Sequence, residues 1–312
     1  MDNMDNQINM TVFNDGGNPY RELLETFLKL PLGGTDEIFA LFASLPGAIF
    51  CEGKGCTERF VYVPGTRKDR ILLTAHADTF WDERYGAELP EWEEPKFALG
   101  LYFAASTKYG LGADDRVGCA LLWGLRSCGH SLLITDGEEH GNMGARYLRK
   151  HHKRLFREIN RTHRMILALD APGNGCYLLK GVDCGEEFPR YIEDKLKVVK
   201  GTMRGEGDLA ILCKRVCGAN LGVGYVNPHR NTEMFTVGGW NELYRNLYAF
   251  LGEEHPRFTV SRTVRFKRRV AERMPAVARV GSKLKRDGLG ATAAACGRRV
   301  KRVFTRSNKK NS

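Results

Sequence analysis

Short apolar runs alternate with amphipathic stretches along the chain between residues 20 and 251. Short apolar runs predict buried strands, and apolar positions that recur every three or four residues predict helices packed on them. The predicted strands cover residues 48–51, 59–63, 71–75, 99–104, 131–135, 165–169 and 221–225. The predicted helices cover residues 20–30, 35–45, 115–127, 143–160, 188–198, 208–213 and 239–251. Since strands alternate with helices, we expect a three-layer α/β/α domain whose central mixed sheet is mostly parallel.

Two local features refine this picture. Thr35 or Asp36 is expected to cap the second helix, because both side chains accept hydrogen bonds from free helix N–H groups. Residues 79–100 (TFWDERYGAELPEWEEPKFALG) do not fit the alternation and predict a surface insertion. This segment holds six acids against two bases. If it folds over a binding site it favours a cationic ligand, and otherwise it is a solvated loop.

Charge divides the chain into two parts. Residues 257–312 contain eighteen Lys and Arg against two acids, a balance of +16, whereas residues 1–256 carry −5. We therefore predict one domain over residues 1–256, with residues 1–15 disordered, and a basic tail over residues 257–312 that is partly helical or disordered. Such a tail can contact a polyanion, either nucleic acid or an anionic membrane surface, or it can simply solubilise the domain.

Composition is that of a globular protein. Apolar residues make up 42% of the chain, which argues against a largely disordered one. No stretch reaches the roughly 18 apolar residues that a membrane-spanning helix needs, and the polar, acidic N-terminus does not resemble a secretory signal. Nine scattered cysteines then suggest reduced thiols, so a cytoplasmic location is expected.

Side chains able to bind metal follow the ends of several predicted strands, where open α/β sheets place their sites. Imidazoles and carboxylates are good ligands for divalent metals, and paired carboxylates can divide metal binding from general-base work. Taken singly, most of these positions have a simpler explanation. His76 can cap its strand and pair locally, Asp114 and Asp115 can cap a helix, and Glu138 and Glu139 can form a solvated acidic loop, whereas an acid at Asp170 is more often functional. The set comprises His76, Asp78, Asp114, Asp115, Glu138, Glu139, Asp170 and His229, with Glu233 four residues beyond the last.

The ordered set resembles the co-catalytic zinc exopeptidase superfamily, which includes zinc aminopeptidases, peptidase T and the carboxypeptidase G-like enzymes. GADDRVGCA is similar to the family's Asp-Asp-Arg/Lys-x-Gly element, and EEHGNMGA to its Glu-Glu-x-Gly-x-x-Gly-Ala element. GEGDLAIL resembles its Gly-x-Thr/Ser-Asp element, but Gly207 replaces the Thr or Ser, which leaves the role of Asp208 open. The likeness spans residues 20–250. The gaps at 77–113 and 171–228 are too short for the extra domain of many relatives, so the compact type matches better.

This resemblance implies a role for each residue. Asp114 bridges two zinc ions and is followed by a cis peptide to Asp115. Glu138 is the general base on the water or hydroxide between the metals, and Asp78 orients a ligand imidazole. Cobalt or manganese can substitute for zinc. The implied metal ligands are His76, Asp114, Glu139, Asp170 and His229, and the implied substrate or supporting residues are Asp115, Asp208 and Glu233.

The resemblance thus implies a hydrolase that cleaves a terminal amide bond. The acidic segment at 79–100 favours an aminopeptidase, which must hold an α-ammonium group. A carboxypeptidase or an N-acyl amino-acid deacylase of the same fold stays an alternative. A binding protein that keeps the fold without turnover is a second one. The expected substrates are peptides or N-acyl amino acids, and the sequence leaves the oligomeric state undetermined.

Overall fold

The central sheet is built from the apolar runs that predict strands. The computed structural model describes residues 19–261 except residues 56, 87, 180 and 203–206. Within them, eight strands form one sheet. In spatial order these are β1 (Ile49–Glu52), β2 (Arg59–Val63), β6 (Ser131–Thr135), β3 (Leu72–His76), β7 (Ile166–Ala171), β10 (Gly218–Gly222), β8 (Cys176–Leu178) and β9 (Val199–Lys200).

The middle of this sheet is parallel and buried. Strands β6, β3, β7 and β10 run parallel to one another, and every residue in them is buried. The pairs β1–β2, β2–β6 and β10–β8 are antiparallel. Parallel strands without a solvent-facing side need helices on both faces, which explains the continuous apolar runs in the sequence.

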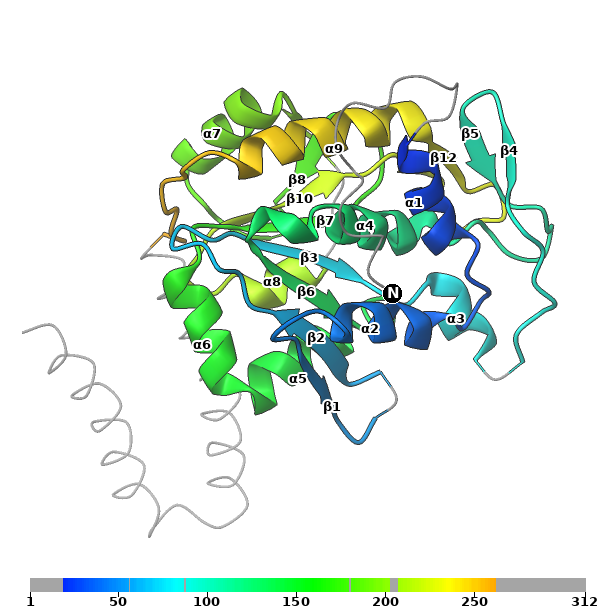
Figure 1. The fold of residues 1–312 in the computed structure, drawn as a ribbon, viewed down its shortest axis with the longest axis horizontal. Helices are drawn as coiled ribbons and strands as arrows, with labels where there is room; N and C mark the ends of the chain where they lie inside the picture. The colour runs from blue at the N-terminus through cyan, green and yellow to red at the C-terminus, as the bar shows by residue number, and fades with distance from the viewer. Residues whose placement is uncertain (1–18, 56, 87, 180, 203–206, 262–312) are drawn as a thin grey trace, which may run out of the picture. The chain divides into compact units, whose positions relative to one another are not determined.

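Helices cover both faces of the sheet (Figure 1). α4 (Ala113–Gly124) connects β3 to β6, whereas α5 (Met143–His151) and α6 (Lys153–Thr162) connect β6 to β7. These crossovers run in opposite directions along the sheet, so right-handed connections place α4 and α5 on opposite faces. Further helices of the central domain are α1 (Pro19–Leu28), α2 (Thr35–Ala43), α7 (Glu187–Leu196), α8 (Asp208–Leu212) and α9 (Val237–Leu251). The predicted three-layer α/β/α fold is confirmed.

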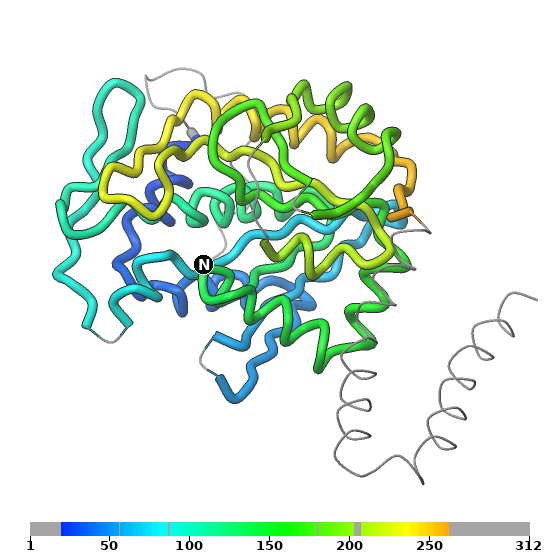
Figure 2. Tube along the Cα trace, turned by 180° about the vertical axis from the view of Figure 1, so that it is seen from behind, coloured from blue at the N-terminus to red at the C-terminus, as the bar shows by residue number. Residues whose placement is uncertain are grey.

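A second, antiparallel sheet lies at one end of the domain. Its strands are β11 (Tyr225–Val226), β12 (Met234–Thr236), β5 (Leu101–Phe103) and β4 (Lys96–Ala98) in spatial order. Figure 2 shows the β4–β5 hairpin beside the β11–β12 segment, although the two are far apart in sequence.

The segment predicted as an insertion has structure of its own. Helix α3 (Phe80–Tyr85) begins with a reciprocal capping box between Thr79 and Asp82. Trp81 is buried in a small apolar cluster with Leu32 and Tyr109. Residues 79–100 therefore contribute a helix, strand β4 and a buried tryptophan to the domain.

Three predicted boundaries are wrong. Residues 143–160 form two helices, because the chain breaks at His152, whose ring packs on Phe60 with 5.0 Å between ring centroids. The cap of α2 is Gly34, without a side-chain hydrogen bond, instead of Thr35 or Asp36. The predicted strand 221–225 spans the end of β10 and the start of β11, which belong to different sheets.

The chain packs on the central domain as far as Val260. Val260 is buried, Phe258 lies 4.9 Å from the Tyr191 ring, and the Phe258 carbonyl accepts the Cys217 N–H. The compact unit accordingly ends at Val260. The predictions for residues 1–15 and for nearly all of the basic tail lie outside the described residues. Among the described residues, no helix has the length and apolar character needed to cross a bilayer.

Candidate metal centre

The candidate ligands come from five segments that meet at one edge of the central sheet. His76 ends β3, and Asp170 lies near the end of the adjacent parallel strand β7. Glu139 lies in the loop between β6 and α5, Asp114 at the start of α4, and His229 in the loop between β11 and β12. The carboxyl ends of parallel strands share one edge of a sheet, which is where these folds place their sites.

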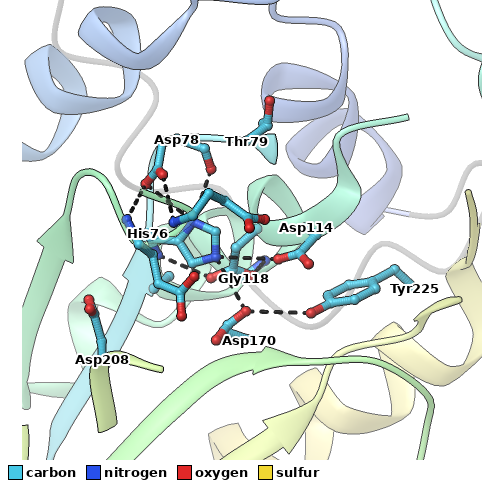
Figure 3. Close-up of polar contacts among 12 residues, drawn as sticks. His76, Asp78, Thr79, Asp114, Gly118, Asp170, Asp208 and Tyr225 are labelled. Atoms are coloured by element: carbon cyan, nitrogen blue, oxygen red, sulfur yellow. Dashed lines mark hydrogen bonds and ion pairs between the residues drawn. The ribbon is translucent and has the colours of Figure 1, made fainter. Parts of the chain in front are cut away.

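The Asp114 carboxylate lies between two imidazoles. Its Oδ1 is 3.3 Å from His76 Nε2, and its Oδ2 is 3.3 Å from His229 Nε2. His76 Nε2 also lies 3.3 Å from Asp170 Oδ1, and His229 Nε2 lies 2.8 Å from Glu139 Oε1. Figure 3 shows the His76 side of this arrangement. The five side chains therefore form two groups that share Asp114.

The surroundings of His76 fix its orientation. Nδ1–H donates to the Asp78 backbone carbonyl at 2.9 Å, so Nε2 faces Asp114 and Asp170. The backbone N–H of His76 donates to Asp115 Oδ2 at 3.1 Å. A ring nitrogen that faces two carboxylate oxygens needs a cation between them, either a proton or a metal ion, and a bound divalent metal would replace the proton.

Asp78 makes more contacts than the sequence predicts. Its Oδ1 lies 3.4 Å from His76 Nδ1, consistent with the orienting role that the resemblance implies. In addition, Oδ1 accepts the Glu138 N–H and Oδ2 accepts the Glu139 N–H, each at 3.1 Å. One buried carboxylate thus couples the end of β3 to the loop that carries both glutamates.

Asp115 and Glu233 hold backbone segments of the site. The peptide bond between Asp114 and Asp115 is cis, as the resemblance implies. Asp115 Oδ1 accepts the Gly118 N–H at 3.2 Å. Glu233 is buried, and its two oxygens accept the N–H groups of Gly112 at 2.8 Å and Asp114 at 3.1 Å. Glu233 therefore connects the loop of His229 to the segment that carries Asp114.

The structure places Asp208 beside the strand end of β6. The Thr135 hydroxyl donates to Asp208 Oδ2, and the other Asp208 oxygen accepts no hydrogen bond from the described residues (Figure 3). No hydrogen bond or ion pair joins Asp208 to a candidate ligand among the described residues, although the charges of His76 and Asp170 act on its carboxyl group. Residues 205 and 206, which belong to the motif that suggested Asp208, lie outside the described residues.

Sequence reasoning missed several residues that support the site. Asn220 accepts the Asp170 N–H at 2.9 Å through Oδ1 and donates through Nδ2 to Asp170 Oδ2 at 3.1 Å. The Tyr225 hydroxyl donates to Asp170 Oδ1 at 3.4 Å. The Phe80 ring stacks on the His229 imidazole at 4.6 Å. Asn220 is a polar residue within a buried apolar run, and this signal could have been recognised.

Buried negative charge dominates the centre. Burial and the nearby Asp170 carboxylate raise the pKa of Glu138 to about 9, and burial with the Asp114 charge raises the pKa of Glu233 to about 8. Hydrogen bonds to Asp114 and Glu139 raise the pKa of His229 to about 10. Burial lowers the pKa of His76, but the surrounding carboxylates outweigh burial and raise it well above its ordinary value.

The donor atoms fit divalent metal ions. Asp114 Oδ1 and Glu139 Oε1 are buried, and each faces an imidazole nitrogen, His76 Nε2 at 3.3 Å and His229 Nε2 at 2.8 Å. No lysine or arginine among the described residues forms an ion pair with Asp114, Glu139 or Asp170. A set of imidazole nitrogens and carboxylate oxygens without thiolate suits zinc, cobalt or manganese. A cation at this position would compensate the negative charge.

Comparisons with known proteins identify the fold. No family model matches the chain, and no curated protein matches it. Aminopeptidase PepT from Bacillus cereus ATCC 10987 is 16% identical over 75% of this chain and 96% of its own, with a TM-score of 0.54. A tripeptidase from Staphylococcus aureus is 13% identical over 75% of this chain and 97% of its own, with a TM-score of 0.54.

The Pyrococcus horikoshii TET1 peptidase, which can assemble into a tetrahedron or a large octahedral shell, is also similar. It is 16% identical over 75% of this chain and 99% of its own, with a TM-score of 0.51. At these identities the likeness concerns the fold. The chain has the fold of these peptidases, which confirms the fold that the resemblance of its motifs implies.

Proposed function

We propose that the protein is a metal-dependent hydrolase that cleaves a terminal amide bond of a peptide. The observation that carries this proposal is the position of Asp114, whose two oxygens each lie 3.3 Å from a different imidazole. In this assignment His76 and Asp170 would hold one zinc ion, Glu139 and His229 would hold the other, and Asp114 would contribute one carboxylate oxygen to each group.

Two bound divalent ions would polarise the scissile carbonyl and acidify a water molecule at neutral pH. The remaining chemistry belongs to Glu138, which is the general base in this proposal. The Asn142 side chain donates to Glu138 Oε1 at 3.1 Å, which leaves Oε2 available. The positive charge of bound metal ions would lower the pKa of Glu138 from about 9, so that its carboxylate could take the proton from the attacking water and deliver it to the leaving amine. Asp78 holds the Glu138 N–H and so fixes this side chain at the site.

Charge around the centre favours an aminopeptidase. α3, in the acidic segment, borders the site, because Phe80 stacks on His229 and Glu83 Oε1 lies 3.0 Å from His140 Nδ1. His140 follows Glu139 directly in the chain. The Glu83 carboxylate at this rim suits a substrate α-ammonium group. A carboxypeptidase or a deacylase would instead need a cationic side chain to hold the substrate carboxylate.

Paired substrates test the proposal on zinc-loaded protein. An aminoacyl-arylamide should be hydrolysed, and the same compound with an acetylated amino group should not. Hydrolysis of N-acyl amino acids with no action on the free aminoacyl-arylamide would point to the carboxypeptidase or deacylase alternative. Two bound zinc ions without hydrolysis of any of these substrates, or of dipeptides, would favour a binding protein that retains the fold.

A further inference from the structure

Basic side chains are concentrated on α5, α6 and the two residues that follow them. Residues 143–164 contain eight Lys and Arg against one acid, Glu158. The rest of residues 1–256 contains 22 Lys and Arg against 34 acids. The positive charge of residues 1–256 is therefore concentrated in this stretch, which is separate in sequence from the basic tail.

Helix α6 turns its charges toward solvent. Phe156, Ile159 and Asn160 are its buried residues. Lys153, Arg157 and Arg161 are exposed and follow one another at intervals of four residues, so they form a row with about 6 Å between successive positions. Arg154 on α6 and Lys150 on α5 are also exposed.

Most of these cations form no ion pair with the described residues. Arg157 Nε donates to the Lys153 carbonyl, and Glu158 lies 3.6 Å from Arg70. Four exposed side chains form no ion pair with any described residue, namely Lys150, Lys153, Arg154 and Arg161. Unpaired cations on a rigid helix exchange their small counterions for a polyanion readily.

Buried Asn160 extends the surface beyond the two helices. Its Oδ1 accepts the N–H groups of Lys214 at 2.9 Å and Arg215 at 2.8 Å, and its Nδ2 donates to the Leu212 carbonyl at 3.0 Å. These bonds fix the segment after α8 against α6. The exposed Arg215 therefore lies next to the row of charges on α6.

The chemistry of this surface matches phosphates better than lipid. A helix that lies on a membrane needs an exposed apolar face. The exposed large apolar side chains of the described residues all lie outside α5 and α6. We propose that the α5–α6 surface, made by Lys150, Lys153, Arg154, Arg157, Arg161 and Arg215, binds the phosphate backbone of nucleic acid without reading its sequence.

The test measures binding of a labelled DNA duplex of about 20 base pairs to the full-length protein at several salt concentrations. The test variant is Lys153→Gln/Arg157→Gln/Arg161→Gln. The matched control is Arg190→Gln/Lys195→Gln/Lys197→Gln, which removes the same charge from basic residues that have acidic partners within 3.5 Å. Unchanged thermal melting and zinc content confirm that each variant is folded.

The α6 variant should lose affinity at least tenfold at 0.1 M salt, and its slope of log affinity against log salt should fall by roughly 2–3. The α7 control should change neither quantity. Equal binding by the α6 variant and the parent would overturn the proposal and assign polyanion binding to the tail. An equal loss in both variants would show that only net charge matters. Binding to phosphatidylserine vesicles that exceeds duplex binding, with the same sensitivity to the α6 variant, would assign the surface to membranes.

Discussion

Gly118→Ala should damage the centre although alanine is the better helix former. Gly118 lies in α4, where the helix crosses β7 closely. A Cβ atom at this position would lie 2.0 Å from the Leu169 carbonyl oxygen and 2.2 Å from Asp115 Oδ1. Leu169 directly precedes Asp170, and Asp115 holds the His76 backbone. The added methyl group therefore presses on the supports of two candidate ligands.

Two opposing contributions, helix preference and overpacking, set the change in the free energy of unfolding. The helix preference of alanine over glycine contributes about 1 kcal/mol of stability. Real contacts of a Cβ atom are about an ångström longer than those at Gly118, so backbone must move, and such overpacking costs about 1–3 kcal/mol or more. We expect a net loss of roughly 1–2 kcal/mol in the free energy of unfolding. A ligand displaced by about 1 Å should also lower kcat/KM by around 10²-fold.

Gly238→Ala is the matched control. Gly238 lies in the first turn of α9, and no atom lies within 4 Å of a Cβ built there. This variant should gain up to about 1 kcal/mol and keep its activity. Urea denaturation gives the stabilities and elemental analysis gives the zinc content. If Gly118→Ala were as stable and as active as Gly238→Ala, the close approach of α4 to β7 would be refuted.

Further predictions follow from the same contacts. Glu138→Gln should keep two zinc ions and lose about 10²–10⁴-fold in rate, whereas Glu139→Gln should lose one zinc, and the reverse pattern would exchange their roles. Burial and the Arg70 charge lower the pKa of His163 to about 3, so the unfolded chain binds the proton first as pH falls below about 6.5. When the pH falls from 7 to 5, the free energy of unfolding should therefore decrease by about 2 kcal/mol less in His163→Gln than in the parent, as measured by urea titration. An equal decrease in both proteins would show that His163 does not cause the acid sensitivity. Deleting residues 262–312, past the packing of Val260, should leave zinc content and turnover nearly unchanged and weaken heparin binding at low salt. Loss of activity would show that the tail contributes to the domain.

Apolar patterning predicts the centre of the fold better than its edges. The runs 59–63 and 131–135 coincide with β2 and β6, because the buried positions of such strands are mostly apolar. Short strands such as β4 and β9 are exposed and carry no such pattern. The break at His152 depends on its packing against Phe60, which periodicity cannot reveal.

The candidate site shows a similar limit. Functional side chains at strand ends are visible in the sequence, since the end of a buried apolar run marks the edge of the sheet. The contacts between these segments are not visible. The Glu233 carboxylate accepts the N–H groups of Gly112 and Asp114, which are more than a hundred residues away in sequence. The Asp78 carboxylate, which follows β3, accepts the N–H of Glu138, which follows the neighbouring strand β6. Such hydrogen bonds depend on the tertiary arrangement, so the sequence indicates these carboxylates but not the backbone groups that they bind.

Anomalous diffraction at the zinc absorption edge from zinc-loaded crystals tests the two-metal assignment most directly. The assignment predicts two zinc peaks, one on each side of the Asp114 carboxylate. One peak should contact His76 and Asp170, and the other should contact Glu139 and His229. A single peak at this carboxylate, or zinc bound only elsewhere, would contradict the proposed centre and the reaction built on it.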